Sequence, residues 1–168
     1  MGFGGLFVRI DDMKLLCVCL GNICRSPMAE GILRKLAREE GLDWEIRSAG
    51  TNRFHKGGPA DARSVAACAG KKIDISSHIA RRMVSGDFDR YDVIFTMADD
   101  VTDEMREFIR PESNEQDRLK IINFLDVLSP GENRSVPDPW YGASGAFGDC
   151  FELVNQASRA WIKKLQIP

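Results

Sequence analysis

Two kinds of hydrophobic pattern alternate along the chain. Short apolar runs bounded by polar or turn residues predict buried strands at residues 14–19, 44–48, 91–97 and 119–125. Apolar residues that recur every three or four positions predict helices at residues 26–40, 60–69, 100–109 and 147–165. Because strands and helices alternate, we predict an α/β fold, a three-layer sandwich whose central four-stranded parallel sheet is flanked by helices.

Capping and terminal signals set the limits of these elements. Ser26 has the residue type of an N-cap for helix 26–40, and Pro27 suits the first helical position. Residues 1–12 show neither hydrophobic pattern and are interpreted as an N-terminal tail. Residues 13–168 contain no repeat, low-complexity segment or linker, and so we predict one domain.

Composition narrows the classes of function. The 168 residues are 43% hydrophobic and 29% charged, with a formal net charge of -2, which is typical of a globular protein and predicts neither a nucleic-acid nor a membrane partner. No apolar run approaches the roughly 18 residues of a membrane-spanning helix, and the first residues do not resemble a secretory signal. The odd number of cysteines, five, predicts reduced thiols and a cytoplasmic location. Their spacing fits no metal motif, and so no metal is expected.

The segment CLGNICRS, residues 19–26, follows the first predicted strand and precedes the first predicted helix. In a parallel sheet such a loop presents backbone N–H groups and the positive end of a helix dipole to an anion. Gly21 and Asn22 tolerate the backbone angles that let successive amides converge, and Arg25 adds a planar fork for two phosphate oxygens. Cys19 lies at the base as a nucleophile whose thiolate the amides and the arginine favour. We therefore predict a phosphate-binding loop after the first strand, formed by Leu20, Gly21, Asn22, Ile23, Cys24, Arg25 and Ser26.

Four segments resemble one known family. VCLGNICRSPMAEG resembles the signature of the low-molecular-weight protein tyrosine phosphatases, and SAGT, SSHIARRM and DPWYG follow in the family's order at residues 48–51, 76–83 and 138–142. The resemblance identifies residues 13–168 as a low-molecular-weight phosphatase domain. It implies hydrolysis of phosphotyrosine through a cysteinyl-phosphate on Cys19, with Arg25 as the phosphate clamp and without a metal or cofactor. The implied partners are phosphotyrosine-bearing proteins and aryl phosphates, with inorganic phosphate or vanadate as inhibitors.

The resemblance also assigns roles to residues outside the loop. Asp138, which has a proline on each side, is implied to be the general acid that protonates the leaving phenolate, although its spacing alone would favour a surface turn. The substrate cleft is implied to be walled by Leu20, Phe54, Trp140 and Tyr141. For each aromatic residue the alternative is ordinary half-buried packing.

A polar network is implied to support the loop through Asn22, Ser26, Ser48 and His78. His78 is interpreted as structural, with a capping or surface histidine as the alternative, and His55 receives no role. Cys24 lies inside the loop, and we predict that it traps oxidised Cys19 in a reversible disulfide. The alternative is that Cys24 packs as a small apolar residue.

Three other functions share parts of this pattern. Related arginine phosphatases carry threonine at the position of Ile23, and an apolar side chain there favours an aryl ester over a charged guanidinium group. Thioredoxin-coupled arsenate reductases need a further cysteine pair, and Cys68 has no cysteine beside it in the sequence. An inactive phosphate-binding module would be expected to lack the cysteine, the arginine or the aspartate, and all three are present. The sequence therefore favours a phosphotyrosine phosphatase.

Overall fold

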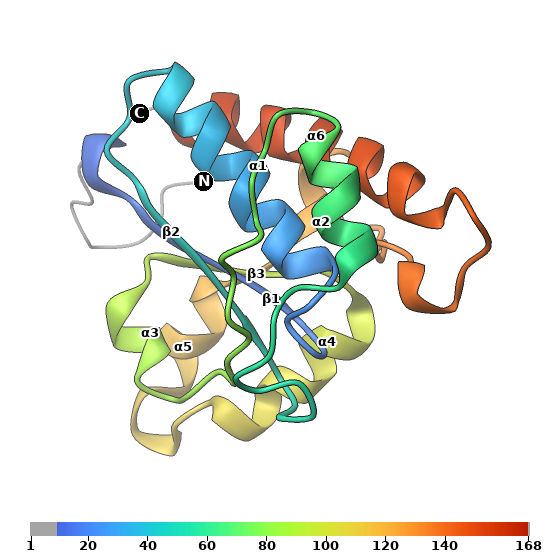
Figure 1. The fold of residues 1–168 in the computed structure, drawn as a ribbon. Coiled ribbons are helices and arrows are strands. Elements are labelled where there is room, and N and C mark those ends of the chain that lie inside the picture. The colour runs from blue at the N-terminus through green and yellow to red at the C-terminus, as the bar shows by residue number, and fades with distance from the viewer. Residues whose placement is uncertain (1–9, 168) are drawn as a thin grey trace.

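A parallel sheet forms the centre of the computed structural model, which describes residues 10–167 (Figure 1). Its four strands are β1 (Lys14–Cys19), β2 (Glu45–Gly50), β3 (Val93–Thr96) and β4 (Ile121–Asn123). They pair in the order β2-β1-β3-β4, and every pairing is parallel. The predicted four-stranded parallel sheet is confirmed.

Helices cover both faces of this sheet. Figure 1 shows α1 (Arg25–Glu39), α2 (Ala62–Ala69) and α6 (Ala146–Leu165) together on one side. The other side carries α3 (Asp87–Arg90), α4 (Asp99–Glu104) and α5 (Asn114–Lys120). The three layers and the α/β class are as predicted.

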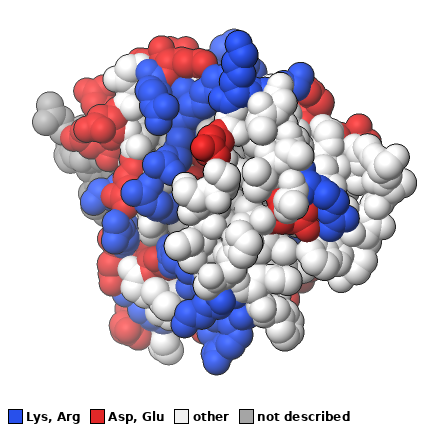
Figure 2. Space-filling model, viewed as in Figure 1, with Lys and Arg blue, Asp and Glu red and all other residues white. Residues whose placement is uncertain are grey.

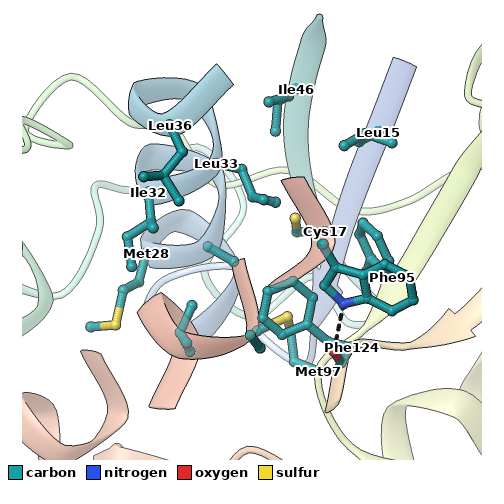
Figure 3. Packing of buried hydrophobic residues seen from close by; sticks show 14 of the residues in the cluster. Leu15, Cys17, Met28, Ile32, Leu33, Leu36, Ile46, Phe95, Met97 and Phe124 are labelled. Carbon is teal, nitrogen blue, oxygen red and sulfur yellow. Dashed lines mark hydrogen bonds between the residues drawn. The ribbon is translucent and has the colours of Figure 1, made fainter. Parts of the chain in front are cut away.

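Side-chain alternation along β1 divides the core between these two layers. Leu15 and Cys17 pack with the residues of α1 and α6, whereas Leu16 and Val18 pack with those of α3 and α4. In the larger cluster, drawn in Figure 3, Trp161 donates a hydrogen bond of 2.7 Å from Nε1 to the carbonyl oxygen of Phe124. A strand that is buried on both faces reads as a continuous apolar run, which is why β1 was recognisable in the sequence.

Several predicted boundaries are wrong. Helix α1 begins at Arg25, after Cys24 in the N-cap position, and Ser26 lies inside its first turn without capping it. The strand predicted to begin at residue 119 begins at Ile121, because Leu119 belongs to α5 and is 69% exposed. Helix α4 ends at Glu104 and continues as a 3-10 helix, Met105–Phe108.

The predicted tail is only partly described. Residues 1–9 lie outside the described residues, whereas Ile10–Asp12 form a short 3-10 helix. The carbonyl oxygen of Ile10 accepts a hydrogen bond of 2.7 Å from Nε1 of Trp44. Of the helices in residues 10–167, none has both the length and the apolar character needed to span a membrane.

The carboxyl ends of three strands converge on the loop that follows β1. The backbone N–H groups of Thr51 and Asn52, just after β2, donate to the carbonyl oxygens of Cys19 and Leu20 at 3.0 and 3.1 Å. A side chain at Gly50 would place its Cβ 2.5 Å from the Leu20 oxygen, so that this close approach requires glycine. After β3, the Met97 carbonyl accepts from the Val136 N–H at 2.8 Å, which fixes the segment before residue 138 to the same edge of the sheet.

Candidate active site

Cys19 ends β1 and lies at the base of the loop, where its side chain is buried. Its Sγ is 2.9 Å from the hydroxyl oxygen of Ser26. That oxygen accepts a hydrogen bond of 2.8 Å from Nδ2 of Asn22, and its one hydroxyl hydrogen faces two acceptors, the Cys19 sulfur and the Ala49 carbonyl oxygen at 3.4 Å. A hydroxyl that donates to sulfur stabilises a thiolate. The Ser26 hydroxyl is therefore committed to the loop interior, which explains why it does not cap α1.

Asn22 is the centre of a buried hydrogen-bond network. Its backbone is left-handed, with φ of 58°, and its side chain is fully buried. Besides Ser26, its Nδ2 donates to Ser48 Oγ at 3.0 Å, and its Oδ1 accepts from the Arg81 N–H at 3.0 Å. His78 Nε2 donates to the Asn22 carbonyl oxygen at 2.7 Å. The structure thus brings together all four residues that were predicted to support the loop.

Arg25 connects the loop to the segment that carries Asp138. Its guanidinium is buried, although charged side chains are rarely buried without a partner. Nη1 donates to the Val136 carbonyl oxygen at 2.9 Å, and Nη2 lies 3.7 Å from Asp138 Oδ2. The other carboxylate oxygen of Asp138 accepts from the Trp140 N–H at 3.1 Å. The fold thereby brings the Cys19 thiol, the Arg25 guanidinium and the Asp138 carboxylate to the same edge of the sheet.

The aromatic residues that were predicted to wall the substrate cleft differ in exposure. Phe54 and Tyr141 are each 86% exposed, and Trp140 is 42% exposed. His55, which received no role from the sequence, has its ring 5.8 Å from the Trp140 ring. It also covers Gly21, where a Cβ would lie 2.9 Å from the imidazole Cδ2. The loop after β2 therefore contacts both the phosphate-binding loop and the aromatic segment.

The other cysteines differ from Cys19 in their environment. All five cysteines are free thiols in the described chain. Burial raises the pKa of Cys24, Cys68 and Cys150 to about 12, and it also raises the pKa of Cys17. These four thiols are held protonated at neutral pH. Within residues 10–167, no three side chains of His, Cys, Asp or Glu are placed to hold a metal ion.

Comparison with known proteins identifies the family. The family model for low molecular weight phosphotyrosine protein phosphatases matches residues 14–167. The chain belongs to this family. It is 34% identical over 157 residues to the low molecular weight phosphotyrosine protein phosphatase of Schizosaccharomyces pombe, an alignment that covers 92% of this chain and 97% of the relative. The resemblance inferred from the four sequence segments is confirmed, and the chain is an enzyme of the phosphatase class.

Solved structures of low molecular weight phosphatases share its fold. A protein tyrosine phosphatase from Entamoeba histolytica, with Hepes in the active site, superposes with a TM-score of 0.82 at 36% identity and covers 91% of this chain and 96% of its own. The Bacillus subtilis arginine phosphatase YwlE, as a variant with a phosphorylated active-site serine, superposes with a TM-score of 0.80 at 25% identity. The match covers 92% of this chain and 97% of YwlE. The fold alone thus accommodates more than one phosphorylated substrate.

Proposed function

We propose that this phosphatase hydrolyses phosphotyrosine in proteins through a cysteinyl-phosphate intermediate on Cys19. The observation that carries the proposal is the position of Arg25. This residue begins α1 directly after the loop, and its buried guanidinium lies 3.7 Å from the Asp138 carboxylate. A guanidinium at a helix N-terminus binds a tetrahedral dianion well. A nucleophile and an acid on either side of that anion are what an in-line displacement requires.

In the first step, the Cys19 thiolate attacks phosphorus. A sulfur–phosphorus bond forms while the bond from phosphorus to the phenolic oxygen breaks, and Asp138 gives its proton to that oxygen. The loop amides and Arg25 hold the non-bridging oxygens, whose charge must be stabilised throughout. The products of this step are a free phenol and a phosphorylated Cys19.

In the second step, water attacks the phosphorus atom of the intermediate. The Asp138 carboxylate, now unprotonated, takes a proton from that water. The sulfur–phosphorus bond breaks, which releases inorganic phosphate and restores the thiolate. The phosphorylated active-site serine of the YwlE variant supports a covalent step at this position in a related phosphatase.

The network around Asn22 has a structural role in this proposal. It holds the loop amides in a left-handed bend that few residues adopt, so that binding phosphate does not require the loop to reorganise. His78 donates to a backbone oxygen inside the network and therefore acts as support.

An aryl phosphate is the substrate class that we favour. Ile23 packs with Cys24, Ala80 and the half-buried Phe147, so that this part of the loop is apolar at the position where the family resemblance implies a threonine in arginine phosphatases. At the right of Figure 2 the surface is largely uncharged, and the segment that leads into α6 lies on this side in Figure 1. Exposed Phe54, Trp140 and Tyr141 supply aromatic surface for a phenyl ring.

Parallel assays on phosphotyrosine, phosphoserine and phosphoarginine peptides test the proposal. We expect the highest kcat/KM on phosphotyrosine and no turnover by the Cys19→Ser variant. Cys68→Ala is the matched control, because it removes a buried thiol from α2, outside the loop, and should leave the activity in place. Faster hydrolysis of phosphoarginine than of phosphotyrosine would overturn the assignment.

A further inference from the structure

We propose that Arg63 is a positioning residue for the general acid, joining the phosphate-binding loop to the segment that carries Asp138. Arg63 lies in the first turn of α2 and belongs to no motif that the sequence indicated. This inference rests on the proposed function, because it concerns how Asp138 is held over the loop. It is carried by three consecutive contacts, from the loop to Asp61, from Asp61 to Arg63, and from Arg63 to Trp140.

The first contact fixes the start of α2 to the phosphate-binding loop. The N–H of Asp61, the N-cap residue of α2, donates to the Ile23 carbonyl oxygen at 2.8 Å. Ser64 Oγ donates to the neighbouring Cys24 carbonyl oxygen at 3.4 Å. The first turn of α2 and the loop are therefore one hydrogen-bonded unit.

The second contact orients the guanidinium. Asp61 Oδ1 accepts from the Arg63 N–H at 2.8 Å and from its Nε at 3.0 Å, and Oδ2 accepts from Nη2 at 2.9 Å. The hydrogen bonds from the Arg63 side chain lower the pKa of Asp61. The carboxylate therefore stays ionised under the mildly acidic conditions that suit an acid-dependent phosphatase, and a bidentate pair fixes the plane of the guanidinium as well as its position.

The third contact places that plane against the aromatic residues beside the acid. The Arg63 guanidinium carbon lies 5.3 Å from the centre of the Trp140 ring and 4.5 Å from that of Phe147. Both distances are in the range of cation–π interactions. The backbone N–H of Trp140 donates to Asp138 Oδ1, so the position of Trp140 determines the direction of the carboxylate. Arg63 thus acts on Asp138 through Trp140.

The acid needs such a support because its own segment is short of regular structure. Between residues 128 and 145 the regular structure consists of the 3-10 helix Pro139–Tyr141, and most side chains there are exposed. A catalytic group that is misplaced by about 1 Å loses rate by about 100-fold. A planar cation packed on two aromatic rings restrains the segment while leaving the Asp138 carboxylate accessible to substrate.

The test compares esters with different leaving groups. Phenyl phosphate needs protonation of its leaving group far more than para-nitrophenyl phosphate does. For Arg63→Ala we expect kcat/KM on phenyl phosphate to fall about 5- to 20-fold more than on para-nitrophenyl phosphate, as the loss of two cation–π contacts suggests. The Arg63→Lys variant should show most of the same selective loss on phenyl phosphate, because an ammonium group neither stacks flat on a ring nor binds both oxygens of Asp61.

Arg90 provides the matched control. It is also an exposed arginine bonded to a carboxylate, with Nε 3.1 Å from Glu45 Oε1 and its guanidinium carbon 5.8 Å from the Tyr91 ring centre. Glu45 begins β2, at the edge of the sheet opposite the loop. Arg90→Ala should leave the ratio between the two esters unchanged.

A double variant separates positioning from general damage. In an Asp138→Ala background, Arg63→Ala should lose its selective effect on phenyl phosphate, because Arg63 acts on the reaction through Asp138. An equal loss on both esters, or an undiminished loss without Asp138, would overturn the proposal. If Asp138→Ala itself shows no dependence on the leaving group, the proposed function fails instead.

Tryptophan fluorescence tests the contact without any activity. Trp44 and Trp161 are buried, whereas Trp140 is 42% exposed, so quenching by acrylamide reports mainly on Trp140. Arg63→Ala should increase the quenching constant, and Arg90→Ala should not. An unchanged constant in a folded Arg63→Ala protein would contradict the contact on which the inference depends.

Discussion

Replacing Asn22 should be among the most destabilising single changes in the phosphate-binding loop. Asn22→Ala removes the side-chain hydrogen bonds to Ser26, Ser48 and the Arg81 N–H. Each buried hydrogen bond contributes about 1 kcal/mol net, which gives about 3 kcal/mol for the set. Alanine at a φ of 58° adds about 1 kcal/mol of backbone strain. We therefore expect the free energy of unfolding to fall by about 4 kcal/mol.

Two further variants divide this loss into its parts. Asn22→Gly loses the same hydrogen bonds but tolerates the left-handed backbone, and so it should be about 1 kcal/mol more stable than Asn22→Ala. Asn133 is the matched control, because it is exposed and has φ of 51°. Asn133→Ala should lose only the backbone part, about 1 kcal/mol.

Urea unfolding followed by circular dichroism measures all three variants against the parent. A domain of ordinary stability has about 5–15 kcal/mol, so the Asn22 variants should remain largely folded for the measurement. Their affinity for vanadate should also fall, because the amides are no longer held in place. If Asn22→Ala lies within about 1 kcal/mol of the parent, or Asn22→Gly is the less stable of the two, the account of the network is wrong.

Three other changes test separate parts of the account. Asp138→Ala should lose about 100- to 10,000-fold in kcat/KM on phenyl phosphate but far less on para-nitrophenyl phosphate; equal losses would remove Asp138 as the acid. Because burial raises the pKa of Cys24 to about 12, its disulfide with peroxide-treated Cys19 should form about tenfold faster per unit of rising pH. Cys24→Ser recovering as fully as the parent after reduction would refute that bridge. Burial opposes ionisation of Asp117, but hydrogen bonds from Arg110 outweigh this effect and lower the pKa of Asp117. The pair therefore stabilises the fold fully above the ordinary carboxyl pKa. This stabilisation is lost as the pH falls through the lowered pKa. Asp117→Asn should therefore lower the melting temperature at neutral pH, with a smaller difference in acid; a constant difference would contradict this.

The sheet was predictable because its strands are buried in a regular way. Leu15 to Cys19 are all buried, so β1 appears in the sequence as an unbroken apolar run. The fourth strand was harder to delimit. Leu119 is apolar and precedes two isoleucines, but it belongs to a polar helix and points to solvent, a case in which tertiary context overrides the hydrophobic pattern.

Within the candidate site, residues that are close in the sequence were easier to predict than contacts that depend on the folded chain. Cys19 and Arg25 are close in the sequence, and their relation could be inferred from their spacing together with the strand before them, the helix after them and the Gly-Asn pair between them. Ser26 was misread as a helix cap because its hydroxyl is directed to Cys19 and Asn22, contacts that no local pattern encodes.

Arg63 illustrates the residues that the sequence did not indicate. Its partner Trp140 lies far along the chain, and an exposed arginine resembles any solvated charge. A signal was nevertheless present in Asp61, which has the residue type of an N-cap and directly precedes α2; the predicted helix began two residues too early, at residue 60. Contacts between distant loops depend on how the strands bring their ends together, and only the folded chain reveals them.

The central claim is that Cys19 carries the phosphoryl group during turnover. Its most direct test is acid quenching of the enzyme during hydrolysis of para-nitrophenyl phosphate, followed by peptide mass spectrometry. We expect one added phosphoryl group on the peptide that contains residues 19–26, located on Cys19 and absent from Cys19→Ser treated in the same way. A phosphoryl group on another residue, or rapid turnover with no phosphorylated peptide under conditions that preserve cysteinyl-phosphate, would contradict the account.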